Sequence, residues 1–579
     1  MGVHLVRWAR EAPQRDFLLE RAAGGAWQAV TYGKALEEVQ LIAGGLLSMR
    51  LTPAAPIVIL SENSVQHALL MLAAMHVGIP IVPVSPAYSL VSRDFAKLKS
   101  IIERVAPAII YVESVTRYAA ALIAIKDLHS AAIVAGAAEA GSSIPAISFQ
   151  DLYCENARHA VAGAFAAVTP DTVAKVLFTS GSTDEPKGVI NTQRMLCSNQ
   201  QAKAQVWPFL EQTPPILVDW LPWNHTFGGN HNFNLVLRNG GTLYIDAGRP
   251  VAALWLQTVV NLREIAPTIY FNVPRGFELL IGELRTDRQL RRRFFSKLQV
   301  IFCAAAPLPQ HLWDALLELC RQAHRQNIPV VSAWGSTETS PLVTDCHFQA
   351  DRTGVIGLPV PGCELKLLAS GDKTEIRVRG DNVFPGYWGQ PELSARQFDE
   401  DGFYRIGDAV KFADESKPER GLVFDGRLSE DFKLLTGTWV NVGNLRTRAM
   451  TALAPLAQDI VVAGHEQRDI SLLIFPNAAA CRAHCADLPP NAGLPRVLAH
   501  PRVRGHIANG LALLWREMPA SSTSAARALL LEEAPSIDAG EITDKGYINQ
   551  RAVLARRKAA VDMLLEAKDA AIISLSVDS

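Results

Sequence analysis

Short apolar runs alternate with amphipathic stretches along the chain from residue 55 to about residue 189. The runs consist almost entirely of Val, Ile, Leu and Ala, which is typical of strands covered on both faces, and the stretches between them have helical spacing. This alternation predicts a mostly parallel α/β sheet. The runs are PIVILS, IPIVPVS, AIIYVES, AAIVAG and KVLFTS, and the pattern resumes at GGTLYIDAG, PTIYFNVP, LQVIFCAAAPL and IPVVSAWG.

The pattern changes after residue 351 to short β-like segments separated by Gly, Asp and Pro. The segments GCELKLL, TEIRVRG, GFYRIGDAVKF and GLVFDGR predict a small, mostly antiparallel β subdomain. A polar stretch, GRLSED at 426–431, then precedes a region of suitable size for a small α/β lobe. We therefore expect a large N-terminal domain over 1–428 and a small C-terminal domain over 429–579.

Composition and charge narrow the class of protein. Hydrophobic residues make up 49% of the 579 residues and charged residues 20%, as in a folded globular enzyme. The net charge of −1 predicts no nucleic-acid partner. No stretch is apolar enough to cross a membrane, and the first residues do not form a secretory signal. Eight scattered cysteines indicate a reducing compartment, so we expect a cytoplasmic protein without a metal at Cys481 and Cys485.

The segment KVLFTSGSTDEPKGVI, residues 175–190, carries the strongest chemical signal. A strand pattern leads directly into small and hydroxyl-bearing residues, followed by a lysine between proline and glycine. Such a loop suits a polyphosphate, because backbone amides can approach closely and the lysine adds a positive charge. It is not a Walker loop, which needs Gly-Lys-Ser/Thr at the start of a helix. The candidate phosphate ligands are Thr179, Ser180, Gly181, Ser182, Thr183 and Lys187.

With this loop the sequence resembles the adenylate-forming enzymes, which include acyl-CoA and aryl-CoA synthetases, nonribosomal adenylation domains and luciferases. It departs from their pattern at Asp184, where the family has glycine. Four further segments resemble family motifs in the same order, and the resemblance extends over about 5–557. These segments are AAAPL at 304–308, WGSTE at 334–338, YRIGD at 404–408 and GR at 426–427.

The resemblance implies a nucleotide site. Ala305 and Ala306 would flank adenine, the Trp334 ring would lie against it, and Gly335 and Ser336 would also bind the nucleotide. Thr337 would bind the α-phosphate and Glu338 would hold magnesium. Asp408 would accept both ribose hydroxyls, a task that suits a carboxylate, and Arg427 would lie near the ribose and phosphates.

The resemblance also implies a mobile C-terminal lobe that carries a lysine. In the family this lysine bridges the acid carboxylate and the α-phosphate, and Lys545 is the only lysine within the matching segment at 540–551. A rotation of the lobe then exposes the same carbon to a thiol. The pivot candidates are Ser429 first and Glu430 second, and Gly437 is a candidate on the thiol side.

The segment LPWNHTFGGNHNFN, residues 221–234, resembles the family's acid-binding segment. His225 would gate the carboxylate end, and Phe227, Gly228 and Gly229 would begin the pocket wall, with the glycines leaving space for a flat ring. Tyr270 and Phe271 could line an aryl pocket, although core packing explains them equally well. Together with FKLLTGTWVNVGNLR at 432–446 and TDKGYINQRAVL at 543–554, this segment is similar to the feruloyl-CoA synthases.

These features predict an ATP- and magnesium-dependent ligase that joins an aromatic carboxylic acid, most like ferulate or another hydroxycinnamate, to coenzyme A. A monomer or homodimer is expected. Two alternatives stay open. An enzyme that loads a carrier protein would share every adenylate motif, and a catalytically weak nucleotide-binding relative would explain Asp184 and the unusual hinge. Oxidation of the adenylate, as in luciferases, has no local support.

Overall fold

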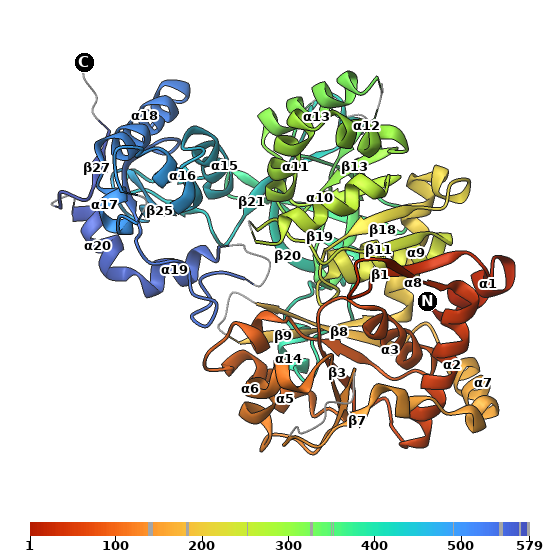
Figure 1. The fold of residues 1–579 in the computed structure, drawn as a ribbon. Helices are drawn as coiled ribbons and strands as arrows, with labels where there is room; N and C mark the ends of the chain where they lie inside the picture. The colour runs from red at the N-terminus through yellow and green to blue at the C-terminus, as the bar shows by residue number, and fades with distance from the viewer. Residues whose placement is uncertain are drawn as a thin grey trace. The chain divides into compact units, whose positions relative to one another are not determined.

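The computed structural model shown in Figure 1 describes residues 1–136, 143–180, 185–251, 253–324, 328–348, 350, 352–489, 491–543, 548–566 and 569–575, with only the backbone of residue 180. The chain divides into two compact units. The larger unit is Met1–Lys366, Arg377–Ile406 and Phe412–Val423, and the smaller unit is Leu367–Ile376, Gly407–Lys411 and Phe424–Ser579. A domain boundary after residue 428 stays a prediction.

The first sheet of the larger unit has the strand order β7-β6-β5-β3-β4-β8-β9. Its strands pair in parallel except β8 and β9, which are antiparallel. The parallel α/β arrangement predicted from the apolar runs is therefore confirmed. The strands are β3 (Ile57–Leu60), β4 (Ile81–Pro83), β5 (Ile109–Val112), β6 (Ala132–Ala135), β7 (Ile147–Ser148), β8 (Val173–Ser180) and β9 (Pro186–Thr192), and the connecting helices are α3 (Val65–His76), α4 (Ala87–Leu90), α5 (Ala96–Val105) and α6 (Val115–Ile125).

Local chemistry sets where these helices begin. Ser64 precedes α3 and its side chain accepts a hydrogen bond from the backbone amide of His67. Ser114 caps α6 in the same way, through the amide of Arg117. These serines satisfy amides that have no partner inside a first helical turn.

A second sheet of the larger unit, with the order β10-β11-β1-β2, is parallel except for the β1–β2 pair. A third, β12-β13-β14, is parallel throughout. The strands are β1 (Asp16–Arg21), β2 (Trp27–Thr31), β10 (Ile216–Asp219), β11 (Thr242–Ile245), β12 (Ile269–Asn272), β13 (Val300–Cys303) and β14 (Val330–Val331). The helices are α1 (Gly2–Glu11), α2 (Tyr32–Ser48), α7 (Arg158–Ala167), α8 (Gln193–Val206), α9 (Phe233–Asn239), α10 (Trp255–Glu264), α11 (Pro274–Thr286), α12 (Arg288–Ser296) and α13 (Gln310–Gln322).

A run of consecutive antiparallel pairs begins at β15 (Ala333–Gly335), which is earlier than the change of pattern that predicts it after residue 351. This strand pairs with β16 (Leu342–Asp345), which pairs with β17 (Val355–Pro359), and β17 pairs with β21 (Leu422–Arg427). The other predicted β segments are also strands. They are β18 (Cys363–Ser370), β19 (Lys373–Gly380) and β20 (Tyr404–Phe412), with the short helix α14 (Pro391–Ala395) between β19 and β20.

The smaller unit contains a sheet with the order β24-β25-β26-β27, in which β25 and β26 are parallel and the other pairs antiparallel. Alternate residues of β24 face two different cores: Ile460 and Val462 enter one, and Val461 enters the other. The elements are the hairpin β22 (Phe432–Lys433) and β23 (Trp439–Val440), then β24 (Ala457–Ala463), β25 (Ile470–Pro476), β26 (Ala525–Leu530), β27 (Ile573–Ser574), α15 (Val442–Ala452), α16 (Ala478–Ala483), α17 (Leu494–Leu498), α18 (Pro501–Glu517), α19 (Gln550–Arg556) and α20 (Lys558–Glu566).

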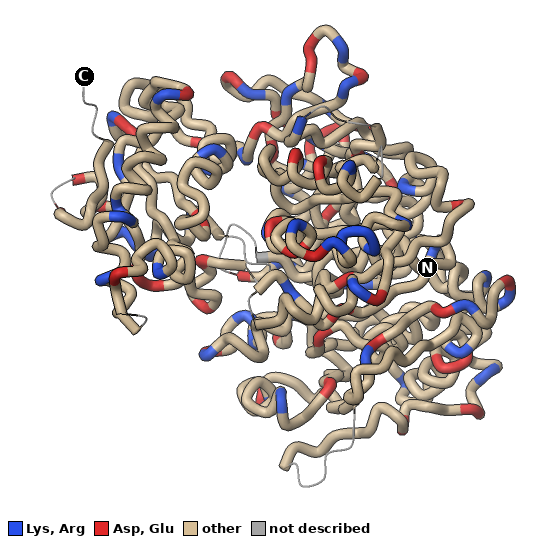
Figure 2. Tube along the Cα trace, turned by 45° about the horizontal axis from the view of Figure 1, so that its top comes forward, with Lys and Arg blue, Asp and Glu red and all other residues tan. Residues whose placement is uncertain are grey.

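Charges of both signs are interspersed along the traced chain in Figure 2, in keeping with the net charge of −1. No disulfide joins the eight cysteines, all of which lie within the described residues. Within the described residues, no helix combines the length and apolar character needed to span a lipid bilayer.

Candidate functional site

The turn that follows β15 folds back on itself. We call residues 335–341 the Thr337 turn. A Cβ atom on Gly335 would lie 1.7 Å from the carbonyl oxygen of Pro341, so only glycine fits this approach. The Thr339 hydroxyl accepts a hydrogen bond from Ser336 N at 2.8 Å and donates to Pro341 O at 2.6 Å. Thr337 begins a single 3₁₀ turn, η5 (Thr337–Thr339), and is 6% exposed.

Side-chain amides from distant segments hold the Thr337 turn. Asn199 of α8 and Asn382 each donate from Nδ2 to the carbonyl oxygen of Leu342 at 2.9 Å. Both also reach Thr339 O, at 3.4 and 3.3 Å. The sequence analysis did not single out these residues. The available signal was the polar composition of α8, which buries Gln193, Asn199, Gln200 and Lys203.

Strands β8 and β9 form the arms of the predicted phosphate loop. Thr179 pairs with Lys187 and Ser180 with Pro186, whereas Gly181, Ser182 and Thr183 lie outside the described residues, as does Asp184. A segment far along the chain runs beside β9: Trp388 N donates to Gly188 O at 2.7 Å, and Ile190 N donates to Gly386 O at 3.3 Å.

Tyr387 joins the phosphate-loop arm to the Thr337 turn. Its hydroxyl donates to Glu338 Oε1 at 3.1 Å, and Lys187 Nζ lies 5.6 Å from the centroid of its ring. Burial and the neighbouring Glu338 raise the pKa of Tyr387 well above its usual value, so the phenol stays protonated and can donate. Lys187 and Glu338, predicted from separate motifs, are thus neighbours through a tyrosine that the sequence analysis did not identify.

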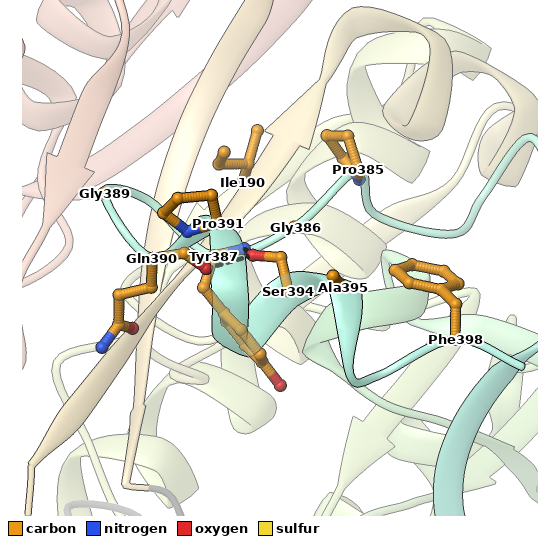
Figure 3. Close-up of a pocket in the computed structure, with 10 residues that line it drawn as sticks. All are labelled: Ile190, Pro385, Gly386, Tyr387, Gly389, Gln390, Pro391, Ser394, Ala395 and Phe398. Atoms are coloured by element: carbon orange, nitrogen blue, oxygen red, sulfur yellow. Dashed lines mark hydrogen bonds between the residues drawn. The ribbon is translucent and has the colours of Figure 1, made fainter.

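A shallow pocket of about 460 Å³ lies beside Tyr387 in the larger unit (Figure 3). The backbone amide of Tyr387 donates to Ser394 Oγ at 2.8 Å, which holds α14 against this pocket. None of the lining residues was predicted as a ligand. They are Ile190, Pro385, Gly386, Tyr387, Gly389, Gln390, Pro391, Ser394, Ala395 and Phe398.

His225 precedes a π-helical segment, η4 (Thr226–Asn232), and its Nδ1 accepts a hydrogen bond from Phe227 N at 3.3 Å. A Cβ atom on Gly228 would lie 2.3 Å from Leu221 O, and one on Gly229 would lie 2.4 Å from Trp223 O. Backbone carbonyls therefore fill the space beside both glycines, where we had expected room for a flat ring. The presence of these glycines follows from close backbone packing, and their contact with a substrate stays a prediction.

Tyr270 and Phe271 are neighbours on β12 and contact different groups of rings. The Phe271 ring lies 6.1 Å from Phe227 and 5.2 Å from Phe302, measured between centroids. The Tyr270 ring contacts Phe277 of α11 and Phe294 of α12 instead. This follows from the alternation of side chains along a strand. Phe271 therefore shares the surroundings of Phe227, and Tyr270 does not.

Two lysines are buried beneath this part of the larger unit. Lys203 of α8 forms an ion pair with Asp345 of β16, and both side chains are almost completely buried. Trp207 donates from Nε1 to the same carboxylate at 3.1 Å, and Lys203 Nζ lies 3.6 Å from the Trp207 ring centroid. Lys175 of β8 donates to Gly229 O at 3.1 Å and has no carboxylate partner among the described residues.

We predict that replacing Lys175 with methionine stabilises the protein below pH 7. Burial lowers the pKa of Lys175 from 10.5 to about 7, so charging it in the folded state costs roughly 5 kcal/mol. The Gly229 carbonyl, which loses its hydrogen bond from Lys175, should offset about 1–3 kcal/mol of this gain, so that a net gain of about 2–4 kcal/mol remains. Urea unfolding at several pH values measures this difference.

The lowered pKa of Lys175 also determines how the stability difference between the variant and the parent changes with pH. Between pH 7 and 10.5 the unfolded chain holds the Lys175 proton more tightly than the folded protein does, so the parent gains stability as pH rises through this window. The advantage of Lys175→Met should therefore shrink toward pH 10.5. Replacing the exposed Lys558 with methionine provides the control, and an equal pH profile for the Lys175 variant and the parent would contradict the prediction.

In the smaller unit, Arg427 Nε lies 3.6 Å from Asp408 Oδ1, and Leu428 N donates to Gly407 O at 3.0 Å. Asp408 is buried, whereas the Arg427 side chain is 63% exposed. These bonds bring together the predicted ribose and phosphate ligands of this unit. Both pivot candidates lie in the turn that follows Arg427, and Ser429 is exposed.

The residue after the two pivot candidates is held by an ion pair and a hydrogen bond. Asp431 forms an ion pair with Lys373, and its Oδ1 accepts a hydrogen bond from Val442 N at 2.9 Å. Lys373 also donates to Asp425 O at 2.7 Å, so one ammonium group contacts both sides of residues 426–430.

The remaining predicted site residues lie in turns or outside the described residues. Ala305 is in the turn after β13 and has a φ of 75°, in the region that favours glycine, and Ala306 follows it. Gly437 lies in the exposed turn between β22 and β23, with a φ of 80°. Lys545 lies outside the described residues.

The family described as AMP-binding enzyme matches residues 5–388, well over half of the chain. The chain belongs to this family of AMP-binding enzymes. The match includes the phosphate-loop arms, Tyr387 and the Thr337 turn, which the larger unit brings together. The predicted membership of the adenylate-forming enzymes is thus confirmed at the level of the family.

Curated members of the AMP-binding family are distant relatives. The chain is 26% identical over 393 residues to the 3-[(3aS,4S,7aS)-7a-methyl-1,5-dioxo-octahydro-1H-inden-4-yl]propanoyl:CoA ligase of Rhodococcus jostii (strain RHA1), with 66% of this chain and 71% of that protein covered. It is 26% identical over 313 residues to the 3-hydroxybenzoate–CoA ligase of Aromatoleum sp. (strain CIB), with 52% of this chain and 54% of that protein covered. The chain thus spans about half the length of the second relative.

A solved structure of the AMP-binding family shares the fold. It is the A domain of carboxylic acid reductase from Segniliparus rugosus, in complex with AMP and a co-purified carboxylic acid. The TM-score is 0.73 at 20% identity, and the comparison covers 98% of this chain and 94% of that one. The mixed α/β fold with a large N-terminal and a smaller C-terminal part is therefore confirmed.

Proposed function

We propose that this protein is an ATP-dependent acid–thiol ligase that forms an acyl-adenylate and then an acyl-CoA. The observation that carries the proposal is the contact of Lys187 and Glu338 through Tyr387, beside the buried Thr337. A cation near the ring of one tyrosine and a carboxylate at its hydroxyl suit a nucleotide phosphate and its metal ion. The hydroxyl-rich residues between β8 and β9 would surround the same phosphates.

The proposed reaction has two steps. A carboxylate oxygen of the acid bonds to the α-phosphorus of ATP, and pyrophosphate leaves. The thiolate of coenzyme A then attacks the acyl carbon, the bond to AMP breaks, and the thiol proton passes to solvent. Lys545 would stabilise the first step, and Asp408 and Arg427 would hold the ribose and phosphates. His225 and Phe227 would border the acid.

Glu338 is the proposed magnesium ligand. Its Oε1 accepts a hydrogen bond from Tyr387, and its second oxygen has no hydrogen-bond donor among the described residues. No group of three or more His, Cys, Asp or Glu residues that could hold a metal occurs in the described part of the chain. A single carboxylate fits magnesium, which proteins commonly bind through one or two carboxylates and substrate phosphates. When bound, the ion would neutralise charge on the phosphates.

The substrate that we propose is an aromatic acid, ferulate or a related hydroxycinnamate. The resemblance of residues 221–234, 432–446 and 543–554 to feruloyl-CoA synthases supports this choice, and the curated relative named for 3-hydroxybenzoate supports an aryl acid. A second candidate is an adenylating protein that passes the acyl group to a carrier-bound thiol. The similarity to the A domain of carboxylic acid reductase favours it.

A pyrophosphate-release screen tests the proposal. We expect ferulate, 4-coumarate and caffeate to give higher rates than benzoate and medium-chain fatty acids, and added coenzyme A to yield the aryl thioester. A preference for fatty acids would remove the hydroxycinnamate assignment. Adenylation without thioester would favour a carrier thiol, and ATP binding without any pyrophosphate release would indicate a relative that has lost its chemistry.

A further inference from the structure

A buried histidine lies among the rings next to the predicted acid-binding residues. His231 is on η4 and is 2% exposed. Its ring centroid lies 5.9 Å from that of Phe227, 5.3 Å from that of Phe271 and 5.3 Å from that of Phe302. We call these four residues the aromatic cluster. A π-helical segment is rare and often marks a functional site.

Neighbouring side chains determine which nitrogen of His231 carries the proton. Asn232 donates from Nδ2 to the carboxylate of Asp219 at 2.9 Å, which fixes the orientation of the amide. Its Oδ1 then faces His231 Nδ1 at 2.9 Å and can only accept. The proton therefore lies on Nδ1, and Nε2 carries a lone pair. Burial lowers the pKa of His231 to about 3, so the ring is neutral at physiological pH.

His231 Nε2 is buried and has no hydrogen-bond partner among the described residues. Lys203, the cation that also lowers the pKa of His231, forms an ion pair with Asp345. Leaving a buried acceptor unpaired is costly, and native proteins seldom do so without a reason. The other three members of the aromatic cluster offer carbon atoms only.

We infer that His231 Nε2 accepts a hydrogen bond from a hydroxyl group on the acid, which makes His231 a specificity-determining residue for hydroxylated aromatic carboxylic acids. This inference rests on the proposed ligase function and deepens it. A neutral nitrogen with a lone pair selects a donor such as O–H and disfavours an ether or a second carboxylate. The phenylalanines suit a flat ring, because aromatic rings pack favourably edge-to-face or offset.

Matched substrates test the inference. Cinnamate and its 2-, 3- and 4-hydroxy isomers are compared by kcat/KM for acid-dependent ATP–pyrophosphate exchange. We expect the parent to prefer one hydroxy isomer over cinnamate by at least about 10-fold, since a buried site built for a hydroxyl rejects the analogue that lacks it. The methyl ether of that isomer cannot donate a hydrogen bond, so it should lose the advantage of the hydroxy isomer over cinnamate. This comparison uses the parent protein alone.

Variants then assign the preference to His231. His231→Phe keeps a ring but removes the acceptor, so the hydroxyl preference should fall to about 2-fold or less while exchange with cinnamate persists. His231→Gln places an amide oxygen near the Nε2 position and should restore part of the preference. The control is His76→Gln, another buried histidine with an unpartnered ring nitrogen, which stacks on Phe165; it should keep the full preference.

The outcomes of these experiments distinguish a failure of the role proposed for His231 from a failure of the proposed ligase function. A parent that uses cinnamate and all its hydroxy isomers equally, or a His231→Phe variant with an unchanged preference, would overturn the role of His231 and leave the ligase proposal intact. If His231→Phe does not fold, an undiminished rate with the methyl ether in the parent overturns the inference, and a lost advantage supports it. Absence of exchange with every acid would instead refute the ligase proposal itself.

Discussion

Replacing Lys545 with alanine should lower acid-dependent ATP–pyrophosphate exchange by roughly 10²- to 10³-fold, the usual loss when one preorganised charge-stabilising group is removed. Negative charge builds up where the acid carboxylate approaches the α-phosphate. In the adenylate-forming family that the sequence resembles, a lysine of the C-terminal lobe stabilises this charge. The first step should therefore suffer most. Isotope exchange at saturating ATP and acid measures this effect.

Thioester formation, the second step of the proposed reaction, distinguishes a role of Lys545 in adenylation from a general loss of structure in the variant. Thioester formation from supplied acyl-adenylate should survive in Lys545→Ala, since that reaction no longer needs a cation between carboxylate and phosphate. Lys558→Ala is the matched control, because Lys558 is 76% exposed and pairs with the exposed Asp562 one helical turn away. Exchange at the parental rate in Lys545→Ala would show that the assignment is wrong.

The buried pair of Lys203 and Asp345 should give the largest effect on stability. Asp345→Asn leaves the Lys203 ammonium buried without its counter-charge, and we expect the free energy of unfolding to fall by about 3–5 kcal/mol. Trp207 would also lose a carboxylate acceptor. Urea unfolding of the parent and the variant measures the loss.

A double-mutant cycle isolates the pairing. Lys203→Met should also destabilise, and the double variant should lose less than the sum of the two single losses, because neither charge is then left unpaired. The control is Glu278→Gln in the exposed pair with Arg275, where a change below about 1 kcal/mol is expected. A loss of that small size in Asp345→Asn would contradict the prediction.

Local patterns predicted much of the fold. The apolar runs from PIVILS to KVLFTS became neighbouring buried strands, and the four segments after residue 351 became strands, because burial on both faces and turn residues leave periodic signals in the sequence. The motif residues Lys187 and Glu338 both contact Tyr387, a residue that the sequence analysis did not identify. Their ligand roles remain predictions.

Long-range contacts escaped the sequence analysis. Tyr387 contacts Lys187, which lies 200 positions before it, and Glu338, which lies 49 positions before it. The amides of Asn199 and Asn382, one far before and one after Leu342 in the sequence, both donate to Leu342 O. The periodicity of apolar residues carries no information about contacts between residues that are far apart in the sequence. The fact that Tyr270 and Phe271 contact different groups of rings was in principle predictable, because side chains alternate along a strand. The packing of Gly228 against Leu221 O was not predictable in this way.

The hydrogen bonds from Asn199 and Asn382 to the Thr337 turn and to the adjoining Leu342 carbonyl should affect the affinity for a nucleotide. With Thr339 and Leu342 carbonyls already bonded and Gly335 pressed against Pro341, the turn holds its shape before any nucleotide arrives. A ligand that docks on a rigid surface loses little free energy to ordering its receptor. The proposed binding of a nucleotide by Thr337 should therefore cost little free energy for ordering of this turn.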